Sequence, residues 1–379
     1  MGRRDEKMIL AIGIDVHKET SSAYALYAGR GEEKDKHRKF LNSFNDEFMK
    51  FPSTPEKMKE LMLFVNGHEP HFLLENSTKT HEIYWVLKNM GADVTVAQAK
   101  DLYRISRSDK KTDRNDSIEL AGYMRRRLLG DNLEFAECYI PSPEWMMKRE
   151  MCRGLFSEKE YLSDTKRRIR AHLLLHGIKL TKEYDDITSL RPLAEMKYSK
   201  DPYLMMQAGF AEDAKRRISF GEKAITQMFA GNRMCDLIFS IVGIGKNTAA
   251  YLTSLIVDIS RFPTRSNFTA SFGVVPKKGD SGDRNPNLGT THRGDDIARE
   301  MLMHCTRSHA RHAKDSVVTK MYERLVNNGK KKREALVAAS RKLLTVVWSV
   351  LKSGRPYTSD IETLMMARRD SEDTERSAE

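Results

Sequence analysis

The N-terminal third of the chain alternates short apolar runs with amphipathic stretches. Continuous or alternating apolar side chains predict short buried strands, at residues 8–15, 21–29, 71–75 and 93–98. Residues 81–91 instead carry apolar side chains at helical spacing and end on a glycine. Because a strand, a helix and a strand joined by short connections make a parallel pair, this pattern predicts an α/β layer.

Helical patterns follow through the middle of the chain. A helix is expected from Asp116 to Leu129, with an apolar face and three closing arginines. From about residue 141 to 232 strand-like runs are sparse, and charged helical stretches such as 158–177 dominate. We expect a long helical arm here, possible also as a coiled coil, although no clean heptad runs through it.

The last section, from about Asp236, is also mostly helical in pattern. Residues 241–256 form a Gly-x-Gly turn that opens a helix, whereas the Gly/Pro/Asp/Asn-rich residues 273–294 predict an irregular loop. Two more helices are expected, at 295–312 and 334–351. The second has a continuous apolar face, formed by Leu336, Ala339, Leu343, Val346, Val347 and Val350.

The predicted fold class is therefore α/β plus all-α. The expected parts are an α/β domain at 1–140, a helical arm at 141–235, a mostly helical domain at 236–366 and a disordered tail at 367–379. A chain of 379 residues is long enough for two or three domains.

The composition favours a polyanionic partner. The chain has 65 Lys and Arg against 53 Asp and Glu, a net charge of +12, and neutralising phosphates releases condensed counterions. Four widely spaced cysteines without a CxxC pair argue against a disulfide framework or a zinc site and fit a reducing cytosol. No signal peptide and no apolar run near the ~20 residues of a membrane span is visible, so we expect a soluble, cytoplasmic protein with no membrane partner.

Four carboxylates occupy positions typical of a metal-dependent nuclease. Asp15 and Glu75 each end an apolar strand, and Asp113 and Asp116 lie three residues apart on one face at the start of a helix. Carboxylates gathered in this way repel one another unless a cation neutralises them. Mg²⁺, or Mn²⁺ in its place, suits the role because it takes oxygen ligands and bridges phosphate oxygens. Nine Lys and Arg against five Asp and Glu between residues 98 and 130 fit phosphates approaching such a site.

Each carboxylate also has an ordinary structural explanation. Asp15 suits the cap of a turn, Glu75 a solvated strand end, and Asp113 or Asp116 a helix N-cap. Taken singly, these are the better explanations. Their joint placement, after two apolar strands and within a basic segment, is what favours a site.

Several segments carry motifs that are recognisable in combination. In the first third they are DVHKET after the first strand, an E-x-S/T segment at Glu75, and SDKKTDRNDSIELA at 108–121. In the last section they are VGIGKNTAAYLTSLIVDISRF at 242–262, FGVVPKKGDSG at 272–282 and THRGDDIAREML at 291–302. Together they resemble the DEDD transposases of the IS 110 / IS 1111 insertion-sequence family, over nearly the whole chain.

The resemblance implies a fold and a chemistry. It implies a RuvC-like, RNase H-type N-terminal domain with Asp15, Glu75, Asp113 and Asp116 as a Mg²⁺-binding tetrad, and a C-terminal transposase domain with Ser281 as the catalytic serine. Members of this family recombine DNA through a phosphoserine link, guided by a structured non-coding bridge RNA. The implied partners are thus double-stranded donor and target DNA, a bridge RNA, and further copies of the chain in a dimer or tetramer.

The chain departs from the family pattern in two places. Glu75 is followed by Asn-Ser-Thr and lacks the usual glycine, which affects the local turn. Asp280 stands before Ser281, where serine is common, and adds a carboxylate beside the nucleophile. Neither change removes a tetrad position or the serine, but how Ser281 is activated stays open.

Basic residues near these motifs are candidates for contacts with DNA or RNA backbones. A charge run is usually only a solvated helix face, so they are collective candidates. They are Arg104, Arg107, Lys110, Lys111, Arg114, Arg125, Arg126, Arg127, Lys246, Lys277, Lys278 and Arg284. The Gly-x-Gly turn before Lys246 lacks the spacing of a nucleotide-binding loop. It suits either a hairpin that meets a DNA phosphate or a plain helix start that packs on its neighbour.

Other functions remain open on the sequence. A junction-resolving or general endonuclease would use the tetrad with water as the nucleophile. A non-catalytic nucleic-acid-binding protein would need neither the tetrad nor the serine. A site-specific DNA invertase of the same family would need no bridge RNA.

Overall fold

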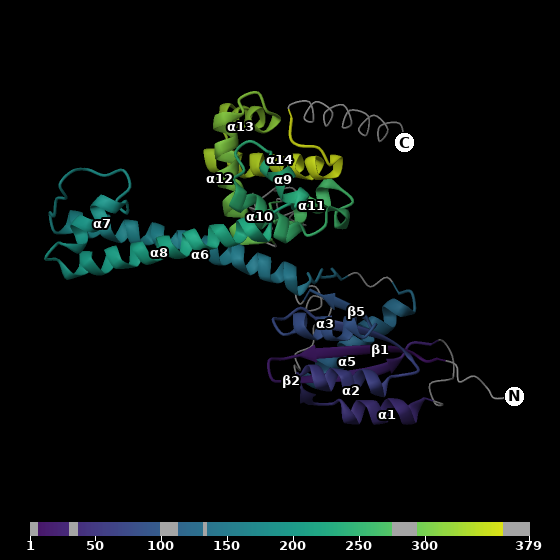
Figure 1. The fold of residues 1–379 in the computed structure, drawn as a ribbon. Helices are drawn as coiled ribbons and strands as arrows, with labels where there is room; N and C mark the ends of the chain where they lie inside the picture. Colours follow the sequence, from purple (N-terminus) through teal and green to yellow (C-terminus); the bar gives the residue numbers. More distant parts are fainter. Residues whose placement is uncertain (1–6, 30–36, 99–112, 132–134, 275–293, 359–379) are drawn as a thin grey trace, which may run out of the picture. The chain divides into compact units, whose positions relative to one another are not determined.

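The computed structural model describes residues 7–29, 37–98, 113–131, 135–274 and 294–358. The chain divides into two compact units, Met1–Ser142 and Pro143–Glu379 (Figure 1). The arm and the last section, expected as separate parts, lie in the same unit. The expected loop at 273–294 and the tail at 367–379 fall largely or wholly outside the described residues.

Unit 1 is built on a mixed five-stranded sheet. Its strands, in the order β3-β2-β1-β4-β5, are β3 (Phe51–Pro52), β2 (Thr20–Tyr27), β1 (Ile9–Val16), β4 (Glu69–Glu75) and β5 (Asp93–Ala97). β1 pairs antiparallel with β2 and parallel with β4, and β4 pairs parallel with β5. The strand–helix–strand prediction of a parallel pair is therefore confirmed.

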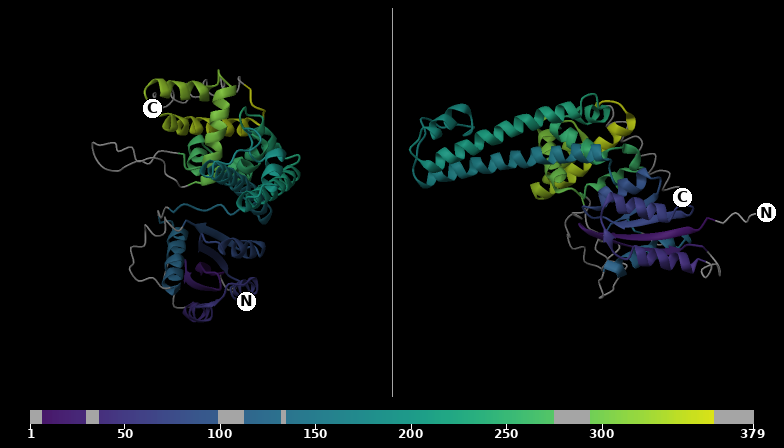
Figure 2. Two further views of the ribbon diagram at one scale, coloured as in Figure 1. Left: turned by 90° about the vertical axis from the view of Figure 1, so that its left-hand side faces the viewer. Right: turned by 60° about the horizontal axis from the view of Figure 1, so that its bottom comes forward.

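Each face of this sheet is covered by helices (Figure 2, left). On one face, the alternate residues Leu10, Ile12 and Ile14 share a buried apolar cluster with α1 (Arg38–Glu47), α2 (Pro55–Phe64) and α3 (Thr80–Asn89). On the other face, Ala11 and Leu73 pack against α5 (Asp113–Leu128). This alternation follows from the two-residue period of a strand, which sends successive side chains to opposite faces.

Unit 2 begins with a helical hairpin. Its long helices are α6 (Pro143–Leu175) and α8 (Pro202–Met228), and α7 (Leu190–Lys197) lies at the far end of the arm (Figure 1). Glu158 of α6 pairs with Arg217 of α8 at 2.9 Å, whereas His172 near the end of α6 meets Asp201 at the start of α8 at 2.7 Å. The two helices are therefore antiparallel, and the expectation of a helical arm is confirmed.

The rest of unit 2 is a cluster of helices around one large apolar core. The elements are α9 (Arg233–Phe239), α10 (Lys246–Ile256), η2 (Ile259–Arg261), α11 (Arg265–Ser271), α12 (Asp296–His312), α13 (Val317–Asn327) and α14 (Lys332–Ser353). The apolar face expected on the last helix is buried, and all of its residues except Leu336 belong to that core. The chain is thus an α/β unit followed by a helical region. None of the helices in its described parts has the length and apolarity that crossing a bilayer requires.

Candidate functional site

Strand register places Asp15 and Glu75 side by side. The parallel pairing of β1 with β4 ends at Ile14 opposite Leu74, so the next residue on each strand is a carboxylate. Neighbouring strands are about 4.8 Å apart. Asp15 is 7% exposed and Glu75, opposite Ala97 of β5, is half-buried. Both acids therefore lie at the carboxyl edge of the parallel strands.

The two carboxylates also share a face of the sheet. Ala11 and Leu73 pack against α5, and residues an even number of positions further along each strand point the same way. Asp15 and Glu75 satisfy this relation. They therefore lie on the face of the sheet that α5 covers.

The direction of α5 brings its start to the same edge. An ideal Cβ on Gly13 would lie 2.3 Å from Ser117 O and from Ala121 N, so the first half of α5 crosses β1 at that point. Further along the helix, Arg125 Nε donates a hydrogen bond of 2.8 Å to Tyr27 O, and Tyr27 pairs with Leu10 at the beginning of β1. The helix thus runs antiparallel to β1, and its N-terminus lies toward Asp15.

The second pair of predicted acids is at that N-terminus. Asp113 is the first residue of α5, and Asp116 follows within the first turn as a partly exposed residue. The side chain of Asp113 lies outside the part of the chain that is described. The structure therefore brings the backbones of all four acids toward one edge of the sheet. The side chains of Asp15, Glu75 and Asp116 are described.

Hydrogen bonds around the turn after Glu75 fix this edge further. The Thr80 hydroxyl donates to Glu75 O at 2.6 Å, and the Ser77 hydroxyl donates to Val16 O at 3.3 Å. The turn without the expected glycine is thus tied both to β4 and to β1. His17 adds a contact of 3.1 Å between its Nε2 and Asp15 Oδ2. Ser77 is the serine of the E-x-S/T segment, whereas motif spacing did not single out Gly13 or Thr80, because their importance depends on contacts that motif spacing does not show.

The donor set suits a hard divalent cation. Carboxylate oxygens at a sheet edge are the ligands that Mg²⁺ prefers. Among the side chains that the structure describes, no group of three or more His, Cys, Asp or Glu is close enough to hold a metal ion. The side chain of Asp113 is outside the described part of the chain. Asp15, Glu75 and Asp116 supply carboxylate oxygens of the kind that binds Mg²⁺.

The basic candidates differ in their surroundings. Arg125 is held by the Tyr27 carbonyl and Arg127 forms an ion pair with Glu137, both toward the end of α5 that is far from Asp15. Arg126 is exposed, with its guanidinium 5.9 Å from the Tyr123 ring centroid. Most of the other basic candidates, and the serine, lie outside the described residues: Arg104, Arg107, Lys110, Lys111, Lys277, Lys278, Ser281, Arg284 and the side chain of Arg114.

The Gly-x-Gly turn packs against another helix. Gly243 has φ of +86°, and a Cβ there would lie 2.5 Å from His309 N on α12. His309 is fully buried, with its Nδ1 2.6 Å from Val242 O and its Nε2 2.8 Å from the Ser316 hydroxyl. The packing explanation of this turn is therefore observed. Lys246, the first residue of α10, is exposed beside it.

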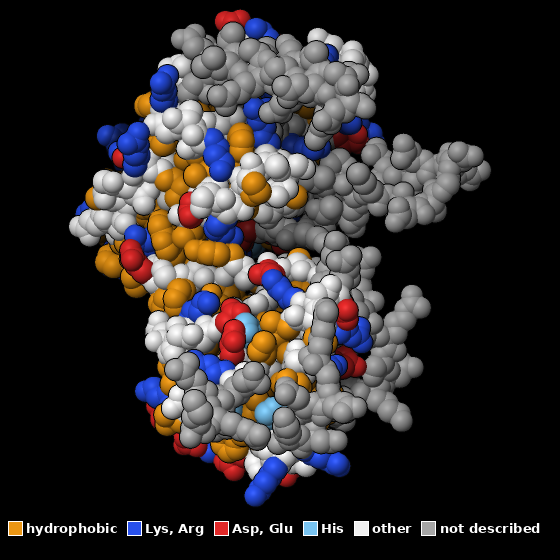
Figure 3. All heavy atoms as spheres, turned by 90° about the vertical axis from the view of Figure 1, so that its right-hand side faces the viewer, with side chains coloured by type: hydrophobic (Ala, Val, Ile, Leu, Met, Phe, Trp, Pro, Cys, Tyr) orange, Lys and Arg blue, Asp and Glu red, His pale blue; other side chains and the backbone are white. Residues whose placement is uncertain are grey.

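A second polar cluster occupies the opposite edge of the sheet in unit 1. His71 Nδ1 lies 2.6 Å from Asp93 Oδ2, and His71 Nε2 lies 3.4 Å from Glu69 Oε1. In Figure 3, histidine side chains lie among acidic and apolar ones on this edge. An adjoining pocket of about 400 Å³ is lined in part by His68 and Met62. Because β4 and β5 begin here and end at Glu75 and Ala97, this cluster is separate from the acidic edge.

Comparison with known proteins relates both units to transposases. A transposase family model of the DEDD type matches residues 12–177, and the model of the transposase IS116/IS110/IS902 family matches residues 235–323. Together they span the acidic edge, the first helix of the arm and most of the helical core. The two units thus have the sequence character of a transposase. The chain belongs to the IS110 family of insertion-sequence transposases.

Individual relatives agree with this assignment. The transposase for insertion sequence element IS1111A of Coxiella burnetii is 27% identical over 137 residues, which are 36% of this chain and 38% of that protein. The putative transposase y4qE of Sinorhizobium fredii is 21% identical over 313 residues, 76% of this chain and 77% of the relative. The pilin gene-inverting protein of Moraxella lacunata is 26% identical over 133 residues, 34% of this chain and 40% of that protein. The first and third alignments thus span well under half of the relatives' lengths.

Proposed function

We propose that this protein is a DNA transposase that cuts and rejoins DNA with Asp15, Glu75, Asp113 and Asp116 as metal ligands and Ser281 as nucleophile. The observation that carries the proposal is the convergence of β1, β4 and the start of α5 at one edge of the sheet. Four acids from three separate parts of the sequence belong to these ends. Family membership supplies the class of reaction.

The proposed chemistry divides between the acids and the serine. Mg²⁺ or Mn²⁺, held by the four carboxylates, would neutralise the charge that develops on the transferring phosphate. Attack by the Ser281 hydroxyl on a DNA phosphate forms a serine phosphodiester and frees a sugar hydroxyl on the departing strand. Attack by a hydroxyl of a second strand then reverses the step, so no phosphodiester is lost.

The finer assignment of the N-terminal fold belongs to the same proposal. We assign unit 1 to the RuvC-like, RNase H-type folds. Three strands in antiparallel order followed by two parallel ones, with acids at the ends of β1 and β4, support that assignment.

We also propose that a structured bridge RNA selects donor and target double-stranded DNA, and that the working form is a dimer or tetramer in the cytoplasm. The net charge of +12 supports a polyanionic partner. Exposed basic residues such as Arg126 and Lys246 are the described candidates for backbone contacts.

Recombination between supercoiled donor and target plasmids tests the proposal, with Mg²⁺ and the RNA that purifies with the full chain. Wild type should give recombinant product and a covalent protein–DNA adduct, whereas Asp15→Asn should give neither. Asp93→Asn, at the opposite edge of the sheet, is the matched control and should recombine normally. If Ser281→Ala still cuts, the protein is an endonuclease that uses water. If neither wild type nor Asp15→Asn gives product while both bind the plasmid equally, it is a non-catalytic binding protein.

DNA inversion is a second candidate function. The similarity to the pilin gene-inverting protein of Moraxella lacunata favours it. A plasmid carrying two inverted copies of the element end distinguishes the two functions. Inversion without any added or co-purified RNA would favour the invertase and argue against RNA guidance.

A further inference from the structure

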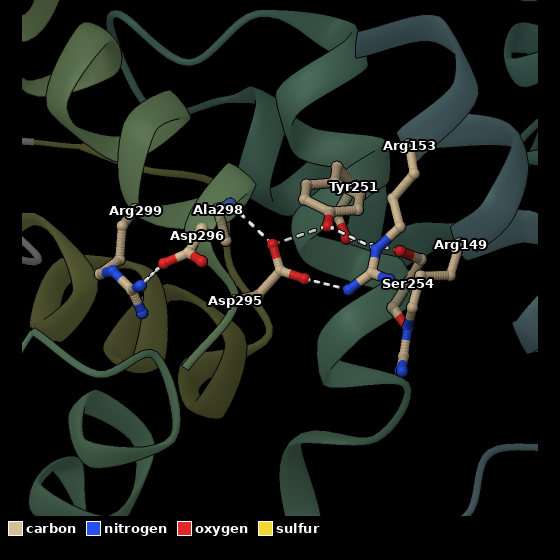
Figure 4. A network of polar contacts seen from close by, with 8 residues as sticks. All are labelled: Arg149, Arg153, Tyr251, Ser254, Asp295, Asp296, Ala298 and Arg299. Carbon is tan, nitrogen blue, oxygen red and sulfur yellow. Dashed lines mark hydrogen bonds and ion pairs between the residues drawn. The ribbon is translucent and has the colours of Figure 1, made fainter. Parts of the chain in front are cut away.

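A polar network joins α6, α10 and the start of α12 in unit 2 (Figure 4). Asp295 is the N-cap residue of α12, and its Oδ1 accepts hydrogen bonds from Ala298 N at 2.9 Å and from the Tyr251 hydroxyl at 2.7 Å. Its Oδ2 accepts from Arg153 of α6, whose Nε also donates to the Tyr251 oxygen at 3.1 Å. Arg153, Tyr251 and Asp295 therefore form a closed triangle, called here the cap network.

Two members of the cap network, Tyr251 and Asp295, are shielded from water, whereas half of the Arg153 side chain is exposed. Tyr251 is fully buried, and 12% of the Asp295 side chain is exposed. Burial alone would raise the pKa of Asp295, but hydrogen bonds from Tyr251, the Ala298 N–H and Arg153 outweigh it and hold this pKa below its ordinary value. The carboxylate is therefore charged at neutral pH, and its three partners fix its position.

The residue before Asp295 touches the chain on the other side of residues 275–293. A Cβ on Gly294 would lie 2.3 Å from the carbonyl carbon of Phe272 and 2.7 Å from Gly273 N. Phe272 and Val274 are buried in the core of unit 2. The described residues that flank 275–293 are thus in contact, and Gly294 is followed directly by Asp295 of the cap network.

We propose that Arg153, Tyr251 and Asp295 are positioning residues that fix where the segment carrying Ser281 rejoins the helical core, and so hold the nucleophile for attack on DNA. This inference rests on the proposed function, because the network has a catalytic consequence only if Ser281 is the nucleophile. None of the three residues acts on the phosphate itself. They act through the start of α12, and a misplacement of about 1 Å at a reacting group costs on the order of 100-fold in rate.

Two nearly isosteric variants test the role. Tyr251→Phe removes one hydroxyl and Asp295→Asn removes one charge, and both keep the shape of the core. We expect each to slow formation of the covalent protein–DNA adduct by about tenfold or more, with DNA affinity within about twofold of wild type. The full chain is assayed with Mg²⁺ and its co-purified RNA on a supercoiled plasmid that carries the gene and its flanking DNA.

A second measurement reports the positioning directly. Hydrogen–deuterium exchange at the amides of 272–274 and 294–298 should accelerate in both variants. Asp201→Asn is the matched control, since Asp201 is also a helix N-cap, accepts from Tyr203 N and Leu204 N, and contacts His172. It should leave both the adduct rate and this exchange unchanged.

The possible outcomes distinguish a failure of this inference from a failure of the proposed function on which it rests. Slower adduct formation with faster exchange in Tyr251→Phe and Asp295→Asn supports the inference. Wild-type rates in both variants, while Ser281→Ala forms no adduct, overturn the inference and leave the proposed function intact. A covalent protein–DNA adduct that still forms in Ser281→Ala would show that Ser281 is not the nucleophile, and would overturn both the inference and the proposed function.

Discussion

At the scale of single residues, the acidic edge depends on a glycine that carries no functional group. Gly13 lies two residues before Asp15, where the backbone of α5 meets β1. Any side chain there would separate the helix from the sheet. The distance between the start of α5 and the strand ends is therefore set partly by the absence of a Cβ atom.

Gly13→Ala should destabilise unit 1. The added Cβ would lie 2.3 Å from two backbone atoms of α5, and overpacking of this kind costs about 1–3 kcal/mol. Urea unfolding measures the change. Gly122→Ala is the control, because Gly122 is in α5 with nothing within 4 Å of a new Cβ, so it should add about 0.5–1 kcal/mol of stability through helix propensity. Equal effects of the two variants would contradict the close-approach explanation.

The single residues differ in how far sequence could identify them. Asp15 and Glu75 were expected because each follows an apolar strand, and a strand pattern is local. Gly13 and Thr80 were not, because nothing beside them in sequence indicates that α5 or the Glu75 carbonyl is their neighbour. Arg125 and Arg127 show the converse: a basic run suggests a nucleic-acid contact, but folding gives both side chains partners within the unit.

At the scale of elements, the Gly-x-Gly turn joins α9 and α10 to α12. Gly243→Ala should cost about 2 kcal/mol or more, since its φ of +86° strains an L-residue and the Cβ would meet His309 N at 2.5 Å. Gly245→Ala provides the control: φ there is −80° and no atom lies within 4 Å, so the change should stay within about 1 kcal/mol. Thermal unfolding of both variants checks the difference, and a similar midpoint in each would refute it.

The arm carries a test of pH dependence. Burial alone would raise the pKa of Asp186, but hydrogen bonds from Lys166 and Thr188 outweigh it and hold the pKa at about 2, below the ordinary 3.8. The contacts of Asp186 with Lys166 and Thr188 therefore make their full contribution to the stability of the folded arm when the pH is well above 3.8. This contribution is lost as the pH falls toward 2.

We expect the thermal unfolding midpoints of wild type and Asp186→Asn to converge as the pH is lowered. Asp186→Asn should unfold at a lower temperature than wild type at neutral pH, by a modest amount because the carboxylate is partly exposed. The difference should shrink as the pH is lowered below 3.8. Asp185→Asn makes the same charge change one residue away and should show no such trend. A difference that persists unchanged at low pH would contradict the assigned cause.

Among the elements, long periodic ones were the most predictable. The arm and the apolar face of α14 followed from patterns many residues long. α1, α2 and α13 were not expected; each is only 10 or 11 residues long, so its apolar pattern extends over about three turns. The division into units was also decided by packing, since the arm shares its unit with the helices that follow it.

At the scale of the whole molecule, the proposed metal site predicts a gain in stability on binding. A ligand that binds only the folded state stabilises it by about 2.7 kcal/mol at 100 times its Kd. Mg²⁺ should therefore raise the unfolding midpoint of wild type and of Asp93→Asn, but not that of Asp15→Asn. A rise that survives in Asp15→Asn would place the ion elsewhere.

The amino-acid sequence by itself indicated the broad class of fold and the family and singled out four acids as candidates, because these depend on local periodicity and on motifs of adjacent residues. The tertiary structure decided how the acids relate. Parallel register puts Asp15 beside Glu75, and the close approach at Gly13 aims the N-terminus of α5 at them. It also decided that Asp295, one residue of a polar motif, is held by Arg153 and Tyr251 from two other helices. Such contacts join positions up to 142 residues apart, a separation at which local sequence patterns carry no information.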